Sequence, residues 1–343
     1  VMTFMPPMLM MLMNLLGIAI VWVASHRINA GNMQVGSMTA FLTYSMMIVM
    51  SFMILTVMSI LIPRAGVAAN RIDEVIMSES SVLDSSDAID INECSGRLEF
   101  DNVSFRYEGS NEDALSGISF TANPGETTAI IGSTGSGKST IVNLIPRFFD
   151  VTAGCITLDG VDIREISMKS LRDQIGLVPQ KGILFSGTID SNIRFGNETA
   201  TPEEVREAAE IAQAFEFIEE KEDKFESAIA QGGSNVSGGQ KQRLSIARAI
   251  AKRPKILVFD DSFSALDMKT DAKLRRVLAK HEKEATKIIV AQRVGTIIDA
   301  EQIIVLDEGE IVGKGRHRDL LRTCETYRQI AESQLSKSEL EVE

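Results

Sequence analysis

Two long runs without charge lie near the start of the sequence and restrict the folds available to it. Residues 4–24 and residues 36–62 form runs of 21 and 27 positions that contain no Asp, Glu, Lys or Arg. A helix needs roughly 20 apolar residues to cross a bilayer, so each run is long enough to span one. The link between them, residues 25–35, is too short for a domain. We therefore expect a membrane-spanning helical hairpin.

Two other interpretations fit these runs less well. A secretory signal peptide needs basic residues before its apolar core and small residues at a cleavage site after it, and neither flanks residues 4–24. Long helices buried inside a soluble protein give the same pattern, so this alternative stays open. At about 1.5 Å per residue the second run reaches about 40 Å, and we expect it to tilt or to project beyond the bilayer.

Charged residues are concentrated after the two runs. From Arg64 onward the chain holds 34 of its 35 Lys and Arg residues and all 47 Asp and Glu residues, so this part has a soluble, net acidic composition. Nucleic-acid binding needs a basic face that displaces counterions from phosphates, and the sequence shows no such stripe. The three cysteines match no metal or redox spacing, so we expect reduced thiols. We expect no nucleic acid among the partners of this chain.

A glycine-rich segment stands between an expected strand and an expected helix. Gly132, Gly137, Lys138 and Ser139 fit the pattern G-x-x-x-x-G-K-[ST]. In this pattern the backbone N–H groups close around phosphate oxygens, the lysine neutralises the β- and γ-phosphates, and the serine hydroxyl can bind Mg²⁺. The sequence therefore predicts a site for ATP and Mg²⁺, in which the ATP-binding residues of the loop are Gly132, Ser133, Thr134, Gly135, Ser136, Gly137, Lys138, Ser139 and Thr140.

Two kinds of strand are expected around this loop. Residues 98–107 and 115–131 alternate apolar and polar side chains, which is typical of an antiparallel layer. Residues 255–261, "KILVFDD", instead contain the continuous apolar run "ILVF", which predicts a central parallel strand. Asp260 would then lie at the carboxyl end of that strand, where open α/β sheets bind ligands, and would bind Mg²⁺. The alternative is that Asp260 is a surface acid that caps the next turn.

These elements, taken together with "SNVSGGQKQRLSIARAI" at residues 234–250, resemble the ATP-binding cassette (ABC) transporters. Tyr107 looks like the aromatic residue that stacks on adenine, and Gln180 like the glutamine that reaches Mg²⁺ and senses the membrane domain. Asp267, in "SALD", looks like part of the loop that crosses the interface between two cassettes. The resemblance also implies that the signature residues bind the ATP of a partner cassette; these are Ser237, Gly238, Gly239 and Gln240.

The resemblance implies a fold and an organisation. The fold class would be an α-helical transmembrane hairpin followed by an α/β P-loop domain with an antiparallel β layer and a helical signature subdomain. The expected parts are membrane helices over residues 1–77, a linker over 78–96, the nucleotide-binding domain over 97–335 and a tail over 336–343. Because the hairpin looks like the last two of six helices of an exporter half, we expect the chain to be the C-terminal part of a longer protein. Arg64 and Arg71 would lie on the cytoplasmic side with the cassette, as the positive-inside rule favours, in a multi-pass protein of the cell membrane.

Two residues depart from the family pattern. Asp261 follows Asp260 where the family usually has Glu, and Gln292 stands where it usually has His. The shorter Asp places its carboxylate differently, and an amide cannot carry a proton as imidazole can. Both residues occupy catalytic positions, so together they predict a site that binds MgATP and hydrolyses it slowly. The chain thus resembles the degenerate-site subunit of bacterial heterodimeric multidrug exporters.

This resemblance implies particular partners. The second half-transporter would be a different chain with Glu and His at the matching positions, and the intact signature of this chain would complete its site. The lipid bilayer and an amphipathic small-molecule substrate are the other expected partners. One alternative is a homodimeric exporter in which Asp261 suffices for hydrolysis. A regulatory cassette without transport is another, and the membrane hairpin argues against it.

Overall fold

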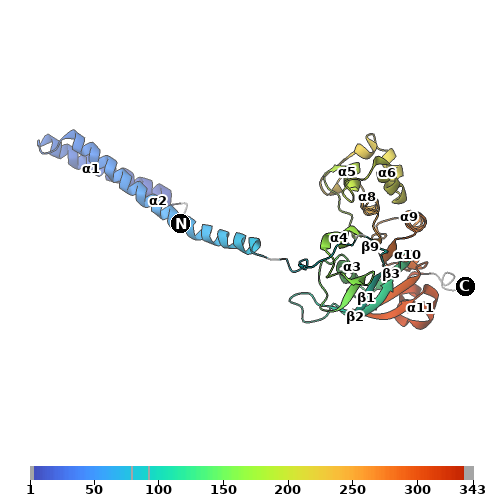
Figure 1. The fold of residues 1–343 in the computed structure, drawn as a ribbon. Helices are drawn as coiled ribbons and strands as arrows, with labels where there is room; N and C mark the ends of the chain where they lie inside the picture. The colour runs from blue at the N-terminus through green and yellow to red at the C-terminus, as the bar shows by residue number, and fades with distance from the viewer. Residues whose placement is uncertain (1–3, 79, 92, 336–343) are drawn as a thin grey trace. The chain divides into compact units, whose positions relative to one another are not determined.

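The computed structural model describes residues 4–78, 80–91 and 93–335, and the chain divides into two compact units, Val1–Ser80 and Ser81–Glu343 (Figure 1). Each unit is described by itself. The tail expected at residues 336–343 lies outside the described residues.

The first unit consists of two long helices that lie side by side, α1 (Met5–Asn29) and α2 (Val35–Ile76) (Figure 1). Both are long and apolar enough to cross a membrane. Helix α2 has 42 residues and continues through Pro63 well past the uncharged run. At about 1.5 Å per residue it is about 60 Å long, which exceeds the roughly 30 Å thickness of a bilayer core. Its last turns contain good helix formers such as Ala, Arg and Glu, which explains why the helix does not end with the apolar residues.

Five hydroxyl groups of α2 donate to backbone carbonyls of the same helix. Thr43 Oγ1 donates to the carbonyl of Thr39 at 2.9 Å, and Ser51 Oγ donates to the carbonyl of Met47 at 2.8 Å. In hydrocarbon an unsatisfied donor costs several kcal/mol, so a hydroxyl that bonds one turn back is tolerated there. These five hydroxyl groups are therefore compatible with a lipid surrounding.

The second unit contains an antiparallel sheet of four strands. Strand β1 pairs with β2 and β4, so the order is β2-β1-β4-β5. The bounds are β1 (Leu98–Phe105), β2 (Leu115–Ala122), β4 (Ala153–Leu158) and β5 (Val161–Asp162). This sheet confirms the predicted antiparallel layer for β1 and β2, but the end of the predicted stretch, residues 127–131, forms β3 in the other sheet instead.

A six-stranded sheet forms the centre of the same unit, in the order β12-β11-β3-β10-β9-β6. All its neighbours are parallel except β11 and β12. The bounds are β3 (Thr127–Gly132), β6 (Ile175–Val178), β9 (Ile256–Asp260), β10 (Thr286–Val290), β11 (Gln302–Asp307) and β12 (Glu310–Gly315). The continuous apolar run at residues 256–259 is therefore a parallel strand inside the sheet, as predicted.

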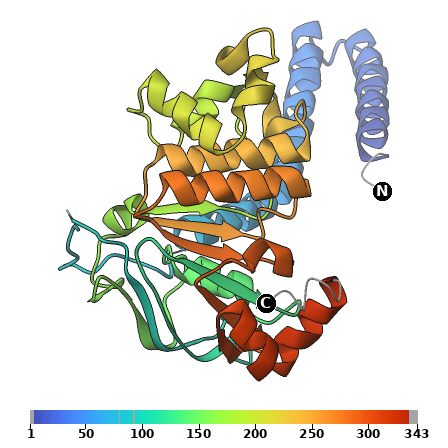
Figure 2. The ribbon, with the colours of Figure 1, turned by 90° about the vertical axis from the view of Figure 1, so that its right-hand side faces the viewer.

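Helices cover the sheet and form a separate subdomain. Figure 1 shows α5, α6 and α8 gathered at one end of this unit, and Figure 2 shows α8 and α9 on the same side of the six-stranded sheet. A short strand pair, β7 (Gly187–Thr188) and β8 (Ala228–Ile229), completes the subdomain. The helices are α3 (Lys138–Leu144), α4 (Met168–Asp173), α5 (Ile189–Arg194), α6 (Pro202–Ile211), α7 (Phe215–Glu219), α8 (Gly238–Ala251), α9 (Met268–His281), α10 (Val294–Ile297), α11 (His317–Thr323) and α12 (Glu325–Gln334), with 3₁₀ turns at Lys224–Glu226 and Gln231–Gly233.

The two faces of the six-stranded sheet bury different cores. On β9, Leu257 and Phe259 join the core formed with the helices, whereas Ile256 and Val258 join the core against the antiparallel sheet. Successive side chains on a strand point to opposite faces, so both faces of β9 must be apolar. All four side chains are fully buried. The fold class expected from the sequence is confirmed: a helical hairpin followed by an α/β P-loop domain with an antiparallel layer and a helical subdomain.

The acidic segment that precedes β1 belongs to the second unit and is hydrogen-bonded to the rest of it. Ile89 donates its N–H to the carbonyl of Glu165 at 2.8 Å, and its carbonyl accepts the N–H of Ser167 at 2.9 Å. Farther along, the Asp159 carboxylate accepts the N–H of Ser95 at 2.7 Å. We call residues 81–97 the linker segment. The sequence interpretation assigned this segment no site.

Candidate nucleotide-binding site

The glycine-rich loop connects β3 to α3 at the carboxyl edge of the parallel strands. The chain leaves β3 at Gly132 and enters α3 at Lys138. Gly137 has a φ of +96°, and a Cβ there would lie 2.6 Å from Leu115 Cδ2 and 2.8 Å from the carbonyl oxygen of Ala114. No side chain fits this position, so the glycine of the motif is required by the shape of the loop.

Lys138 lies within the curve of this loop. Its Nζ donates to the carbonyl oxygens of Gly132 at 2.9 Å and Ser133 at 2.5 Å, and to Ser136 Oγ at 3.2 Å. Burial lowers the pKa of Lys138, and the negative charges of Asp261 and Asp260 offset part of this change. The ammonium group is thus the positive centre of the loop, where the phosphates of a nucleotide would need it.

The groups predicted to hold Mg²⁺ come from three segments. Asp260 ends β9, Ser139 is in the first turn of α3, and Gln180 follows β6. Burial raises the pKa of Asp260, Asp261 raises it further, and Lys138 offsets part of the rise. All three candidate ligands offer oxygen, and Mg²⁺ is bound in nucleotide sites by one or two carboxylates with phosphate oxygens and water. The donor set therefore fits Mg²⁺, which would neutralise phosphate charge when bound.

Asp261 is held by two amide side chains. Its Oδ2 atom accepts hydrogen bonds from Gln180 Nε2 at 3.1 Å and from Gln292 Nε2 at 2.7 Å. Its backbone has a φ of +45°, and only 6% of the residue is exposed. The two residues that depart from the family pattern, Asp261 and Gln292, are therefore in direct contact. The glutamine that was expected at Mg²⁺ also bonds to the same carboxylate.

Tyr107 lies beside the loop, as expected. Its ring packs edge-on against Phe105 at 4.8 Å and against Phe149 at 5.5 Å between ring centroids. Its hydroxyl lies 3.2 Å from Thr140 Oγ1. The sequence interpretation missed Phe149, because nothing local indicates that it packs on a tyrosine 42 positions earlier.

A hollow of about 930 Å³ unites most of the predicted nucleotide residues. It also has a wall that sequence reasoning missed, formed by α12 near the end of the described chain. Gln334 Nε2 donates to the carbonyl of Gln292 at 2.8 Å, and Gln334 Oε1 accepts the N–H of Val294 at 2.8 Å. The lining residues of this hollow that come from α12 are Thr326, Gln329, Ile330, Ser333 and Gln334. The amphipathic pattern of α12 predicts a helix but not its position at this site.

Replacing Gln334 by leucine removes both bonds that hold the backbone on either side of residue 293. We expect a loss of about 1 kcal/mol in stability, which lowers the midpoint of thermal unfolding by about 2–4 °C. We also expect MgATP to raise the midpoint by less than in the parent, because Gln292 is no longer fixed. The control is Glu332→Leu, since Glu332 is exposed on the same helix and does not line the hollow. Equal behaviour of the two variants would contradict this role for Gln334.

The signature residues stand apart from this hollow. Ser237 caps α8: its Oγ accepts the N–H of Gln240 at 3.3 Å, and Gln240 Oε1 accepts the N–H of Ser237 at 3.0 Å. Asp267 caps α9 in the same manner by accepting the N–H of Thr270, which lowers the pKa of Asp267. Within the described residues, neither cap lines the hollow beside Lys138. The structure therefore brings together the loop, Tyr107, Gln180 and Gln292, but not the predicted signature or interface residues.

The fold and this site define a P-loop nucleotide-binding domain. Comparison with known families makes this more specific, because residues 115–264 match the family model described as "ABC transporter". The cassette thus belongs to the ABC transporter family, as the motifs predicted.

Similar proteins agree with this assignment. An uncharacterized ABC transporter ATP-binding protein of Mycobacterium tuberculosis (strain ATCC 25618 / H37Rv) is 44% identical over 332 residues, which are 96% of this chain and 57% of that protein. The ATP-dependent lipid A-core flippase of Hahella chejuensis (strain KCTC 2396) is 36% identical over 97% of this chain and 57% of its own length. The β-(1→2)glucan export protein NdvA of Rhodopseudomonas palustris (strain ATCC BAA-98 / CGA009) is 43% identical over 82% of this chain and 49% of its own length. The chain thus spans about half the length of these relatives.

A solved structure also resembles the chain along nearly its whole length. It is a bacterial Atm1-family ABC exporter with ATP bound, with a TM-score of 0.79 and 32% sequence identity. The match covers 98% of this chain and 59% of the exporter chain.

Proposed function

We propose that this chain is part of a subunit of an ATP-driven membrane exporter whose own nucleotide site binds MgATP and hydrolyses it slowly. The observation that carries the proposal is the contact of Gln180 and Gln292 with a single carboxylate oxygen of Asp261. A general base must be free to accept a hydrogen bond from the attacking water. Two amide donors already occupy the Oδ2 atom of Asp261, which leaves only Oδ1 to accept from water.

The binding part of the site is intact under this proposal. Lys138 supplies the positive charge for the β- and γ-phosphates, and Asp260 with Ser139 supplies oxygen ligands for Mg²⁺. Gln292 can donate a hydrogen bond to a γ-phosphate, but its amide cannot take up and release a proton. We therefore propose that the site holds nucleotide firmly while the hydrolytic step is slow.

The signature residues would act on a partner. The 14-residue helix α8 begins directly after Ser237, so its first backbone N–H groups and its positive end are available for the γ-phosphate of a second cassette. We propose that this partner is a different half-transporter with Glu and His at the matching positions, and that Asp267 lies at the interface between the cassettes. The competent site of the pair would then combine the partner's phosphate loop with this chain's signature.

We further propose a location and a substrate class. Helices α1 and α2 would cross the cell membrane in a multi-pass protein, with the cassette in the cytoplasm. One of the similar proteins is named as a lipid A-core flippase, and the exposed side chains of α1 and α2 are mostly apolar. An amphipathic molecule is the substrate class that such a membrane surface would accept.

The test is ATPase activity of the full-length protein in lipid nanodiscs, alone and with its partner. We expect slow phosphate release by the protein alone and at least about tenfold faster release by the pair, because a positioned acid–base group contributes about 10²–10⁴-fold. Substrate should stimulate the pair further. Fast turnover by the protein alone would instead support a homodimer that uses Asp261. A pair that closes on ATP without stimulation by any substrate would support a regulatory cassette.

A further inference from the structure

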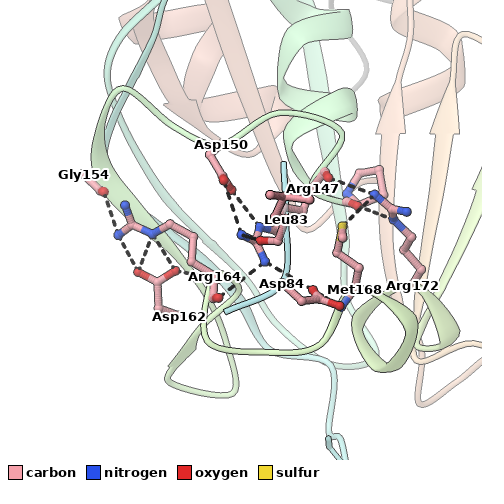
Figure 3. Close-up of polar contacts among 10 residues, drawn as sticks. Leu83, Asp84, Arg147, Asp150, Gly154, Asp162, Arg164, Met168 and Arg172 are labelled. Carbon is pink, nitrogen blue, oxygen red and sulfur yellow. Dashed lines mark hydrogen bonds and ion pairs between the residues drawn. The ribbon is translucent and has the colours of Figure 1, made fainter. Parts of the chain in front are cut away.

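Arg147 joins the linker segment to the loop that follows α3 (Figure 3). Only 4% of Arg147 is exposed, and its backbone has a φ of +53°. Its Nη2 donates to the carbonyl of Leu83 at 3.0 Å, and its Nη1 lies 3.8 Å from Asp84 Oδ1. Asp84 Oδ1 also accepts the N–H of Met168 at 2.8 Å. The linker segment is therefore fixed to the cassette at a buried arginine as well as by the hydrogen bonds of Ile89 and Ser95.

The same arginine closes a short loop. Arg147 Nε donates to Asp150 Oδ1 at 2.7 Å, and Nη2 donates to Asp150 Oδ2 at 3.3 Å, so the guanidinium binds both carboxylate oxygens (Figure 3). Such two-point pairs restrict geometry more strongly than a single bond does. The residues enclosed between the two partners, 148 and 149, are thus constrained by the ion pair.

One of the enclosed residues reaches the nucleotide site. The Phe149 ring packs edge-on against Tyr107, with the centroids 5.5 Å apart and the planes at 83°, and it also contacts Phe105 at 5.5 Å. Tyr107 lines the hollow that holds the phosphate loop. A path therefore runs from Asp84 through the ion pair to Arg147, along the chain to Phe149, and through the ring contact to Tyr107.

We propose that docking of the linker segment on Arg147 positions Phe149 against Tyr107 and thereby sets the affinity of the site for the adenine ring. The inference rests on the proposed function and includes in it the expected stacking of Tyr107 on adenine. Arg147 is a positioning residue here, since it acts through Phe149 and does not touch the nucleotide. Because coupling between two binding events is reciprocal, adenine binding would in turn hold the linker segment on the cassette. The linker segment would then respond to binding of the adenine ring as well as of the phosphates.

The experiment separates the base from the phosphates. MgATP and Mg-tripolyphosphate are titrated onto the full-length protein in nanodiscs, for the parent and for the variants Arg147→Met and Asp84→Ala. Aromatic pairs contribute enough that their loss changes an affinity by about 3- to 10-fold, so we expect MgATP binding to weaken by about that factor. Tripolyphosphate has no ring to stack, and its affinity should change by less than about 2-fold, within the usual error of additivity.

Matched controls use the same part of the chain. Asp87 is an exposed carboxylate of the linker segment, and no side-chain contact of Asp87 is present among the described residues, so Asp87→Ala should leave both affinities unchanged. Phe149→Leu should weaken MgATP as Asp84→Ala does. The double variant should be no weaker than Phe149→Leu alone, because both changes break the same series of contacts.

The contradicting outcomes are distinct. If Tyr107→Ala leaves MgATP binding unchanged, the stacking role in the proposed function is wrong. If Tyr107→Ala weakens MgATP binding but Asp84→Ala and Arg147→Met do not, the role of the linker segment is overturned and the proposed function stands. Equal weakening of MgATP and tripolyphosphate would show a structural role only and would also overturn the inference. If Arg147→Met fails to fold, Asp84→Ala decides the question, because Asp84 is 40% exposed and its removal leaves the Arg147–Asp150 pair in place.

Discussion

Full-length protein that carries both Asp261→Glu and Gln292→His is expected to hydrolyse MgATP about 10²- to 10⁴-fold faster than the parent. Glu would carry the carboxylate one methylene farther from the backbone, and His would replace the amide that now bonds to Asp261 Oδ2 at 2.7 Å. The imidazole can carry a proton or a charge near the γ-phosphate. The measurement is phosphate release by the protein purified without a partner, since the intact signature can serve a second copy of the same chain.

The single variants show whether the two positions act together. Because Asp261 and Gln292 are in contact, we expect the effects of the single substitutions not to add up to that of the double variant. Asp261→Asn is the control, and it should give no increase, because it retains the shorter side chain and removes the negative charge. A double variant that binds MgATP as the parent does but is no faster would show that these two residues do not limit the rate.

Replacing Lys138 by alanine is expected to weaken MgATP binding by about 100-fold or more, which corresponds to about 3 kcal/mol. The ammonium group is the positive charge within the phosphate loop, and its removal leaves Asp260 and Asp261 facing the triphosphate without compensation. Equilibrium titration of the full-length protein measures the loss. Lys169→Ala is the matched control, since 91% of the Lys169 side chain is exposed and it pairs only with Asp173 among the described residues.

The same variant should change the response to pH. Lys138 holds the pKa of Asp260 below the value that burial and Asp261 would otherwise give it. Without Lys138 the pKa of Asp260 rises, so the carboxylate becomes protonated earlier as pH falls. Residual Mg²⁺-dependent binding should therefore disappear at a higher pH in Lys138→Ala than in the parent. Binding of Mg²⁺-nucleotide that is unchanged in affinity and in pH dependence would show that Lys138 does not contact the phosphates.

Local patterns predicted the parts of the site that lie within single segments. The loop from Gly132 to Ser139 is recognisable because its glycines and lysine are close in sequence and are required by backbone geometry. The strand that ends at Asp260 is recognisable because both of its faces are buried, which gives a continuous apolar run. The two long helices follow from uncharged runs of sufficient length.

The features that sequence reasoning missed depend on contacts between distant segments. Gln334 reaches Gln292 across 42 positions, and Arg147 reaches Leu83 across 64. Neither pair gives a periodic pattern in the sequence, because in each pair a side chain bonds to a backbone carbonyl that any residue could supply. The bond between the side chains of Gln180 and Asp261, 81 positions apart, likewise joins distant segments. The mutual capping of Ser237 and Gln240 is different, because a serine three residues before a glutamine at a helix start is a capping pattern that the sequence itself shows.

The alternation of buried side chains along β9 has a consequence for the motions of the cassette. Strand β9 is paired on both edges and covered on both faces, so its amides should be among the slowest to exchange with solvent hydrogen. The antiparallel sheet and the helical subdomain pack on opposite faces of the six-stranded sheet. Because each has its own core, each can loosen without disturbing the other. Asp260 is the last residue of β9, and Lys138 lies at the end of the loop that leaves β3 in the same sheet. Both residues are therefore attached to the backbone that we expect to open least often. The carboxyl edge of the parallel strands, where both residues lie, can therefore keep its geometry while the layers that cover the sheet fluctuate.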